Sequence, residues 1–273
     1  MRLISQTVGN DAALTGYIQE PSAELSTATV RPAVLVLPGG GYFITSDREA
    51  EPVALAYLAE GFNTFVLRYS VGAEAPFSNS LADAEAALRW IRGHADELHV
   101  DPEKVAVAGF SAGGHLASSL AVGADKPDAL VVGYPVTLSE FGPAIGKDIL
   151  NVPDHVTSDT PPTFLFSTCD DTVVPIRNSL EFLGALASAG VPFESHIYLL
   201  GPHGLSLSRP LTASGHAELV EPSVAQWFAD SVRFLRSVFG DFPVEGQSET
   251  FATLVARKHP GQDSARTAAD EQR

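Results

Sequence analysis

The sequence predicts an α/β protein with a doubly wound, mostly parallel sheet and helices on both of its faces. Short apolar runs alternate with segments of helical periodicity through the first 240 residues, without an internal repeat. Most of these runs are apolar at every position, which is typical of strands covered on both faces. The chain has 273 residues, of which 45% are hydrophobic, and is long enough to bury such a core without a disulfide.

The predicted strands are the apolar runs, and the first 30 residues are expected to add antiparallel strands at an edge of the sheet. The six runs cover residues 33–37, 64–67, 105–108, 130–132, 163–166 and 195–198.

Helices are predicted between the strands. Ser46 and Glu49 have the spacing of a capping box and predict a helix that opens there. A second helix is indicated by apolar residues at helical spacing and is expected to stop at Gly93. Its apolar residues are Leu81, Ala84, Leu88 and Ile91. Further helices are predicted over residues 179–190 and 224–238.

Two segments do not fit this alternation. Residues 136–160 contain several Pro, Gly and Asp residues and follow a strand, where α/β folds place binding loops. Residues 241–273 are polar and are expected to form a C-terminal extension with a disordered end, although 251–255 could still pack as a short helix. We therefore predict one domain over residues 1–240 and no large cap.

The charge balance excludes several classes of function. The chain has 17 Lys and Arg against 33 Asp and Glu, for a net charge of −16. A nucleic acid or an anionic membrane requires a basic face, so neither is expected as a partner. There is no apolar stretch of the roughly 20 residues that span a bilayer and no signal peptide pattern, so a cytoplasmic protein is expected. The sequence leaves a homo-oligomer open.

No cofactor or metal is expected. Cys169 is the only cysteine, which excludes an internal disulfide and a multi-cysteine metal site, and we expect this residue to be buried. The glycine-rich segment at 39–41 lacks the residues of a phosphate-binding loop.

The motif Gly-Phe-Ser-Ala-Gly at residues 109–113 predicts a nucleophile. It follows the apolar run 105–108 and precedes a helical stretch, which is the strand–turn–helix context of a nucleophile elbow. In such a turn Ser111 is held above the carboxyl edge of the sheet, and the helix N-terminus favours developing negative charge. The competing interpretation is a glycine-rich turn without chemistry, and the context favours the nucleophile.

A serine needs an adjacent base, and position selects among the eight histidines. His203 directly follows the last predicted strand and is the expected base, with His216 as the alternative. His115, one turn into the helix that follows Ser111, is expected to pack, and His196 lies inside a predicted strand.

The acid is expected after the strand 163–166, where Asp170 and Asp171 both qualify. We assign Asp171 to the histidine, because an Asp at such a turn can accept a hydrogen bond from Nδ1–H and fix the tautomer. Asp170 is then a turn or N-cap residue. The sequence alone does not separate two adjacent carboxylates.

A tetrahedral intermediate requires backbone N–H donors for its oxyanion. The residue after the nucleophile, Ala112, supplies one donor. The second is expected from the loop at residues 38–42, where Gly40 and Gly41 leave their N–H groups unhindered. Tyr42 is placed at the rim of the site.

The sequence also indicates residues that line the substrate pocket. Tyr42 and Phe110 are expected to contact substrate, and Phe43 and the 136–160 loop could shape the pocket.

With these residues placed, the chain resembles the α/β-hydrolase superfamily, and most closely the lipase/esterase branch of acetyl esterases, acetyl xylan esterases and feruloyl-esterase-like proteins. The resemblance is carried by residues 38–42, 67–69, 87–92, 101–104, 109–116 and 224–227 and extends over roughly 30–240. It implies an α/β-hydrolase fold and a serine carboxylesterase for short acyl esters, often acetyl groups on sugars or xylo-oligosaccharides. Pro38 stands where the hormone-sensitive-lipase branch has a histidine, and no long cap is evident, which argues against large acyl pockets.

The leading hypothesis is therefore a carboxylic ester hydrolase acting on a small-molecule ester through an acyl-enzyme. A feruloyl esterase and a peptidase or amidase are the alternatives on the same fold. A binding protein that has lost catalysis is a third hypothesis, which the presence of all three triad residues disfavours.

Overall fold

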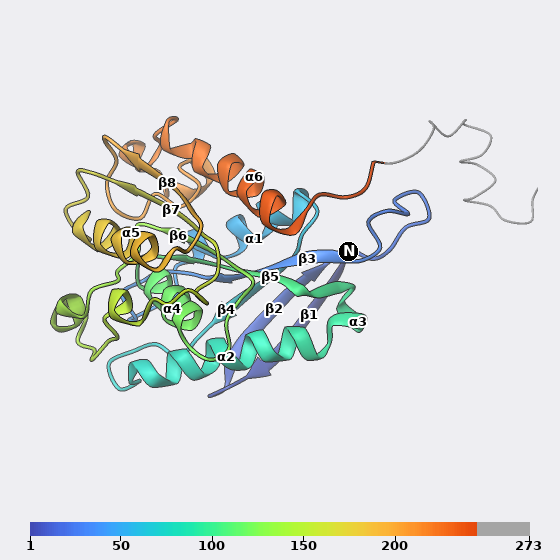
Figure 1. Ribbon diagram of the computed structural model, residues 1–273, viewed down its shortest axis with the longest axis horizontal. Helices are drawn as coiled ribbons and strands as arrows, with labels where there is room; N and C mark the ends of the chain where they lie inside the picture. Colours follow the sequence, from blue (N-terminus) through green and yellow to red (C-terminus); the bar gives the residue numbers. More distant parts are fainter. Residues whose placement is uncertain (245–273) are drawn as a thin grey trace, which may run out of the picture.

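The computed structural model describes residues 1–244 and contains one eight-stranded sheet between layers of helices (Figure 1). The strands lie in the order β1-β2-β4-β3-β5-β6-β7-β8. β2 pairs antiparallel with β1 and β4, whereas all other neighbours are parallel. The strands are β1 (Arg2–Val8), β2 (Ala12–Ile18), β3 (Arg31–Leu37), β4 (Asn63–Arg68), β5 (Val100–Phe110), β6 (Ala129–Gly133), β7 (Thr163–Thr168) and β8 (Phe193–Tyr198). The predicted fold class, the six apolar strands and the antiparallel edge are confirmed.

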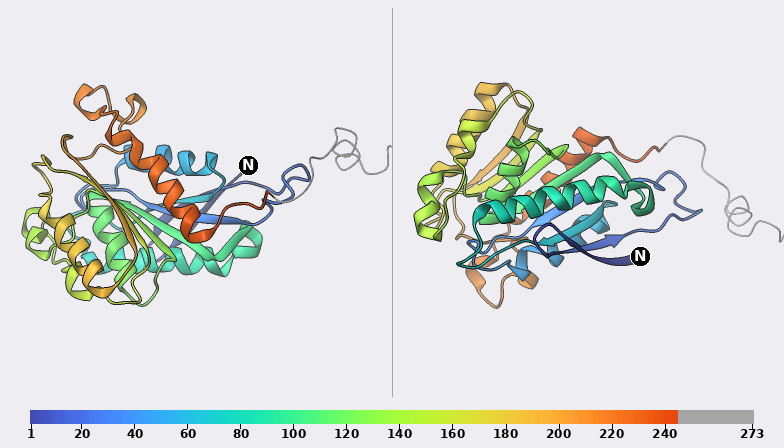
Figure 2. Two further views of the ribbon diagram at one scale, coloured as in Figure 1. Left: turned by 45° about the horizontal axis from the view of Figure 1, so that its top comes forward. Right: turned by 90° about the horizontal axis from the view of Figure 1, so that it is seen from below.

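The helices cover both faces of the sheet, which explains why the central strands are apolar throughout (Figure 2). In β3, Ala33, Leu35 and Leu37 face one core, and the intervening valines face the other. The first core is closed by α2 (Phe77–Gly93), α3 (Ala95–Leu98), α4 (Ser111–Val122) and α5 (Arg177–Ala189), and the second by α1 (Glu51–Ala59) and α6 (Trp227–Phe239).

The parallel arrangement brings distant loops to one edge of the sheet. The loops after β3, β5, β7 and β8 all leave from carboxyl ends of parallel strands, so they meet along that edge. These are the loops that contain the predicted site residues.

The segment 136–160 is packed onto the domain. It contains the 3-10 helices Ser139–Ile145 and Val152–His155, and its apolar side chains Ile149 and Val152 belong to the first core. Lys147 Nζ donates to the carbonyl oxygen of Gly72 at 2.6 Å, which attaches the segment to the connection between β4 and α2.

Two local predictions are wrong. Ser46 makes no side-chain cap bond and Glu49 does not reach back to it; a 3-10 turn covers Asp47–Glu49 and α1 begins at Glu51. The Glu49 side chain points instead into the protein. Cys169 is exposed, because it lies just after β7 at the edge of the sheet. The helix considered for 251–255 lies outside the described residues.

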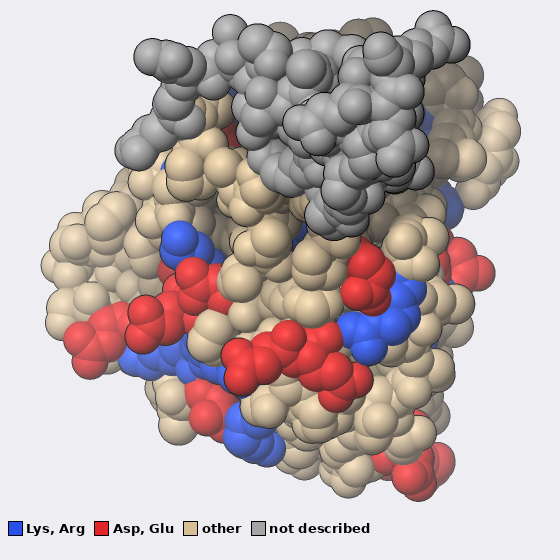
Figure 3. All heavy atoms as spheres, turned by 90° about the vertical axis from the view of Figure 1, so that its right-hand side faces the viewer, with Lys and Arg blue, Asp and Glu red and all other residues tan. Residues whose placement is uncertain are grey.

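On the face drawn in Figure 3, acidic and basic side chains lie next to one another. Within residues 1–244, none of the helices is both long and apolar enough to cross a membrane.

Candidate active site

Ser111 sits in a sharp turn between β5 and α4. Its backbone φ is +52°, a left-handed conformation that costs free energy for a residue with a Cβ and marks a position held by its surroundings. Ser111 is also the first residue of α4, so the helix N-terminus lies directly at the hydroxyl.

The turn requires a close approach of α4 to the sheet. A Cβ placed on Gly113 would lie 2.1 Å from the carbonyl oxygen of Leu37 and 2.4 Å from that of Pro38. Only a glycine fits there, because backbone atoms of β3 and the following loop occupy the space. The elbow motif is therefore also a packing motif that sets α4 against the end of β3.

The structure brings His203 and Asp171 to this serine. Ser111 Oγ lies 2.7 Å from His203 Nε2, and His203 Nδ1 lies 2.6 Å from Asp171 Oδ2. The other carboxylate oxygen of Asp171 accepts hydrogen bonds from the N–H groups of Val173 and Val174 at 2.8 and 2.9 Å. The Asp171 side chain is only 2% exposed, so these bonds hold it in one orientation.

Asp170 has a different set of contacts from Asp171. Its Oδ1 accepts the N–H of Gly201 at 2.7 Å, and Thr168 Oγ1 donates to the Gly201 carbonyl at 2.6 Å. Both bonds hold the loop at residues 199–206, which we call the histidine loop. Asp170 thus fixes the backbone two residues before His203.

The loop at residues 38–42, which we call the glycine loop, lies beside the nucleophile. The N–H of Gly39 is used by Glu49 Oε2 at 2.8 Å, whereas the N–H groups of Gly40 and Gly41 have no acceptor among residues 1–244. Gly40 has φ +127°, and a Cβ there would meet the Ile44 carbonyl oxygen at 2.3 Å. Gly40 and Gly41 therefore each present a free N–H donor, and the N–H of Ala112 in the first turn of α4 is a further donor.

Tyr42 and Phe110 do not lie where the sequence analysis placed them. Both side chains are fully buried. Tyr42 turns inward with φ +61°, and its hydroxyl bonds to His115 Nδ1 at 2.8 Å; Phe110 points to the opposite core and contacts the Trp227 ring with centroids 5.6 Å apart. In contrast, Phe43 is 53% exposed, and its ring covers Gly41.

The other three histidines weighed in the sequence analysis make contacts elsewhere. His216 is exposed and pairs with Glu218 at 3.4 Å. His196 lies in β8 and bonds to Glu194 at 2.9 Å. His115 is buried between the Tyr42 hydroxyl and the Leu150 carbonyl oxygen, and burial lowers its pKa to about 4. Since Nε2–H must donate to the carbonyl, Nδ1 accepts from Tyr42.

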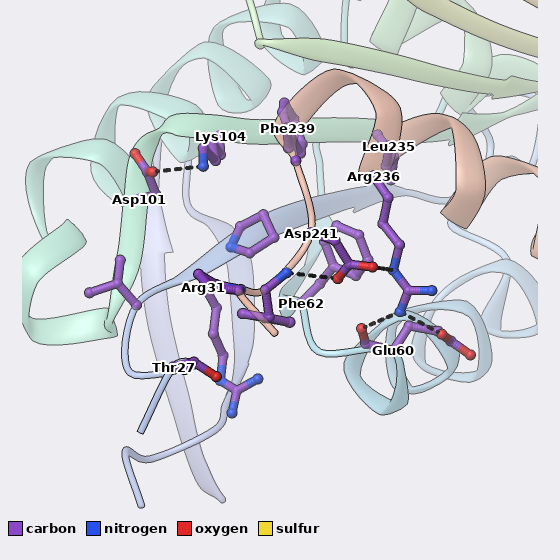
Figure 4. A pocket seen from close by; sticks show the side chains of 15 residues that line it. Thr27, Arg31, Glu60, Phe62, Asp101, Lys104, Leu235, Arg236, Phe239 and Asp241 are labelled. Carbon is purple, nitrogen blue, oxygen red and sulfur yellow. Dashed lines mark hydrogen bonds and ion pairs between the residues drawn. The ribbon is translucent and has the colours of Figure 1, made fainter. Parts of the chain in front are cut away.

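A pocket away from the candidate active site is lined by several charged side chains (Figure 4). It lies at the amino ends of β3 and β5, on the opposite edge of the sheet from Ser111. Its charges compensate one another: Lys104 pairs with Asp101 at 3.6 Å, and Arg236 pairs with Glu60 at 3.1 Å. In the part of the chain that the structure describes, no three His, Cys, Asp or Glu side chains are grouped as a metal ion would require.

Comparison with known proteins identifies the family of this chain. The BD-FAE family model matches residues 18–133, a range that contains the glycine loop and the nucleophile elbow and ends before Asp171 and His203. MGS-M1, an α/β-hydrolase enzyme from a Medee basin deep-sea metagenome library, is 42% identical to this chain. The match to its crystal structure has a TM-score of 0.82 and extends over 87% of this chain and 98% of the MGS-M1 chain. The chain belongs to the α/β-hydrolase family.

Within the α/β-hydrolases, the matches include carboxylic ester hydrolases. The acetyl ester-xyloside bifunctional hydrolase of Caldicellulosiruptor lactoaceticus is 34% identical, with a TM-score of 0.72 over 84% of this chain and 88% of that one. The acetylxylan esterase of Xylanibacter ruminicola is 28% identical over 63% of this chain and 40% of its own length. Endo-1,4-β-xylanase B of Butyrivibrio fibrisolvens is 32% identical over 76% of this chain and 38% of its own length. The chain thus spans about two fifths of these two curated relatives.

The site contains residues that the sequence analysis missed. The sequence predicts Glu49 to be part of a helix cap, and Tyr134, directly after β6, belongs to no motif. A positive φ of +37° at Tyr134 and a 4% exposed Glu49 distinguish them in the structure. The local sequence pattern indicates neither the positive φ of Tyr134 nor the burial of Glu49.

Proposed function

We propose that this protein is a serine carboxylesterase that hydrolyses short-chain, acetyl-type esters, with acetylated sugars or xylo-oligosaccharides as its substrate class. The observation that carries the proposal is the continuous hydrogen-bonded chain from Ser111 through His203 to Asp171. The substrate class is supported by the acetylxylan esterase and acetyl ester-xyloside hydrolase among the similar proteins.

The reaction proceeds by two acyl transfers. His203 Nε2 takes the proton of Ser111 as Oγ attacks the ester carbonyl, and Asp171 stabilises the imidazolium through Nδ1–H. The N–H groups of Ala112 and of Gly40 or Gly41 receive the oxyanion. His203 then returns the proton to the leaving alcohol. Water attacks the acyl-enzyme by the same route and releases the carboxylic acid.

The decisive test is hydrolysis of p-nitrophenyl acetate by the wild-type protein and by Ser111→Ala. We expect a loss of about 10³-fold or more if Ser111 is the nucleophile. Equal rates in the two proteins would rule out the mechanism. Labelling of Ser111 by a fluorophosphonate probe provides an independent check, because a scaffold without catalysis would stay unlabelled.

The substrate class is tested separately with a panel. Acetylated xylo-oligosaccharides, feruloyl esters and p-nitrophenyl esters of rising chain length are compared by kcat/KM, together with the anilide that matches the best ester. Preference for acetyl esters supports the proposal. A preference for feruloyl esters would indicate a feruloyl esterase instead, and a preference for the anilide would indicate an amidase.

A further inference from the structure

The turn Asp47–Glu49 contains a buried carboxylate, that of Glu49, next to the candidate site. The Glu49 side chain is buried, and unlike its neighbours it forms no ion pair with a cation of residues 1–244. Asp47 and Glu51, on either side, both pair with Arg68 near the surface. A buried carboxylate without a cation costs folding free energy unless its oxygens are fully hydrogen-bonded.

Both oxygens of Glu49 are used, and both bonds lead to loops of the site. Oε2 accepts the N–H of Gly39 at 2.8 Å, and Oε1 accepts the hydroxyl of Tyr134 at 2.6 Å. A Cβ on Gly39 would lie 2.7 Å from Oε2 and 3.0 Å from the Cβ of Ser111. The carboxylate therefore lies close to the nucleophile without reaching the reacting atoms.

The bond to Tyr134 continues to the histidine loop. The Tyr134 hydroxyl accepts the N–H of Ser206 at 2.9 Å, and its ring packs on the His203 ring with centroids 5.0 Å apart. Burial and the nearby Glu49 raise the pKa of Tyr134 far above its usual value, so the hydroxyl keeps its proton and donates to Glu49. Glu49 thus holds one loop directly and the other through Tyr134.

The same turn anchors the histidine loop a second time. The Arg48 guanidinium donates to the carbonyl oxygen of Gly204, and Ser206 Oγ donates to the Arg48 carbonyl at 2.5 Å. The segment Asp47–Glu49 is therefore attached to the backbone just before the oxyanion donors and to the backbone just after His203.

We infer that Glu49 is a positioning residue for acyl transfer, and the inference rests on the proposed esterase function. By binding the N–H of Gly39, its carboxylate leaves the next two N–H groups of the glycine loop to face the substrate. By binding Tyr134, it sets the distance between those donors and His203. Misplacement of such groups by about 1 Å is enough to lower a rate by about 10²-fold.

The test compares Glu49→Gln with Tyr134→Phe and the surface control Glu51→Gln. A glutamine has the same shape but turns an N–H₂ group toward one of the two donors, so one bond is lost or reversed. We expect kcat per titrated active site to fall by about 10- to 100-fold, with little change in KM. Affinity for a boronic acid, which forms a tetrahedral adduct on Ser111, is expected to fall in parallel. Glu51→Gln is expected to match the wild type.

Tyr134→Phe keeps the buried ring and removes only the link to the histidine loop, so it tests the inference even if Glu49→Gln folds poorly. We expect a smaller loss of kcat, and a double variant that is less impaired than the product of the two single losses, because the changes share one link. Full kcat per titrated site in both single variants, with only a lower Tm, would overturn the inference. Absence of Ser111-dependent ester hydrolysis in the wild type would instead refute the proposed function.

Discussion

The Tyr42 hydroxyl lies 2.8 Å from His115 Nδ1, and this buried hydrogen bond joins the glycine loop to the nucleophile helix α4. His115 Nε2 lies 2.9 Å from the Leu150 carbonyl oxygen, so the same ring also holds the 136–160 segment. Because burial lowers the pKa of His115 to about 4, the imidazole is neutral at pH 7, so Nδ1 accepts from Tyr42 and Nε2–H donates to Leu150. The contact thus makes the integrity of the site dependent on pH.

This dependence has a definite sign. Burial lowers the pKa of His115 to about 4 in the folded protein, whereas an unfolded histidine has a pKa of about 6.5. Above pH 6.5 both states are neutral, and as the pH falls toward 4 only the unfolded state binds a proton. The free energy of unfolding should therefore fall over this range, with a contribution from His115 of about 3 kcal/mol. Urea denaturation of the wild type and His115→Gln at several pH values measures it. The variant should lack this contribution, and parallel pH curves would contradict the prediction.

The two adjacent carboxylates are predicted to differ in their effect on the rate. Asp171→Asn disturbs the tautomer of His203 and should lower kcat by about 10³- to 10⁴-fold. Asp170→Asn keeps an amide oxygen that can accept the Gly201 N–H, so its effect should stay below about 10-fold. Steady-state hydrolysis of an acetyl ester compares them. A larger loss in the Asp170 variant would reverse the assignment.

Two glycine substitutions are predicted to have opposite effects on stability. Gly113→Ala places a Cβ against backbone oxygens of Leu37 and Pro38, so the protein should lose several kcal/mol, of order 3 or more, or fail to fold. Gly184 lies in α5 with nothing within 4 Å of a new Cβ, and Gly184→Ala should stabilise by up to about 1 kcal/mol. Thermal denaturation of both variants checks this pair. A destabilised Gly184→Ala or a fully stable Gly113→Ala would be inconsistent with it.

Phe43 is predicted to contact the substrate. Its exposed ring covers Gly41, one of the free N–H donors, so an ester bound there must pass beside it. Phe43→Ala should raise KM for aryl and longer acyl esters with little change in Tm. Leu55→Ala removes an exposed side chain of α1, 43% accessible, and is the matched control. Unchanged KM values in the Phe43 variant across the ester panel would exclude this contact.

The sequence by itself determined the sheet and the turn at Ser111. Strands such as 163–166 are apolar at every position because both faces of the sheet are covered, and that pattern is visible locally. The elbow at 109–113 is likewise a local signal, because a Cβ on Gly109 would meet Gly113 and Ala117 of the same strand–turn–helix unit. These features depend on short-range periodicity and backbone geometry.

Tertiary structure decided the partners of the side chains. Asp170 and Asp171 have almost the same sequence context. The path of the histidine loop decides that Asp170 binds the N–H of Gly201 and that Asp171 binds His203. Tyr42 turned inward to His115, and Glu49 became the link between two loops rather than a helix cap. These outcomes depend on hydrogen bonds between residues far apart in the chain, and the local pattern is compatible with either arrangement. One arrangement of these hydrogen bonds is selected because α4 and the turn Asp47–Glu49 pack closely against the carboxyl edge of the sheet.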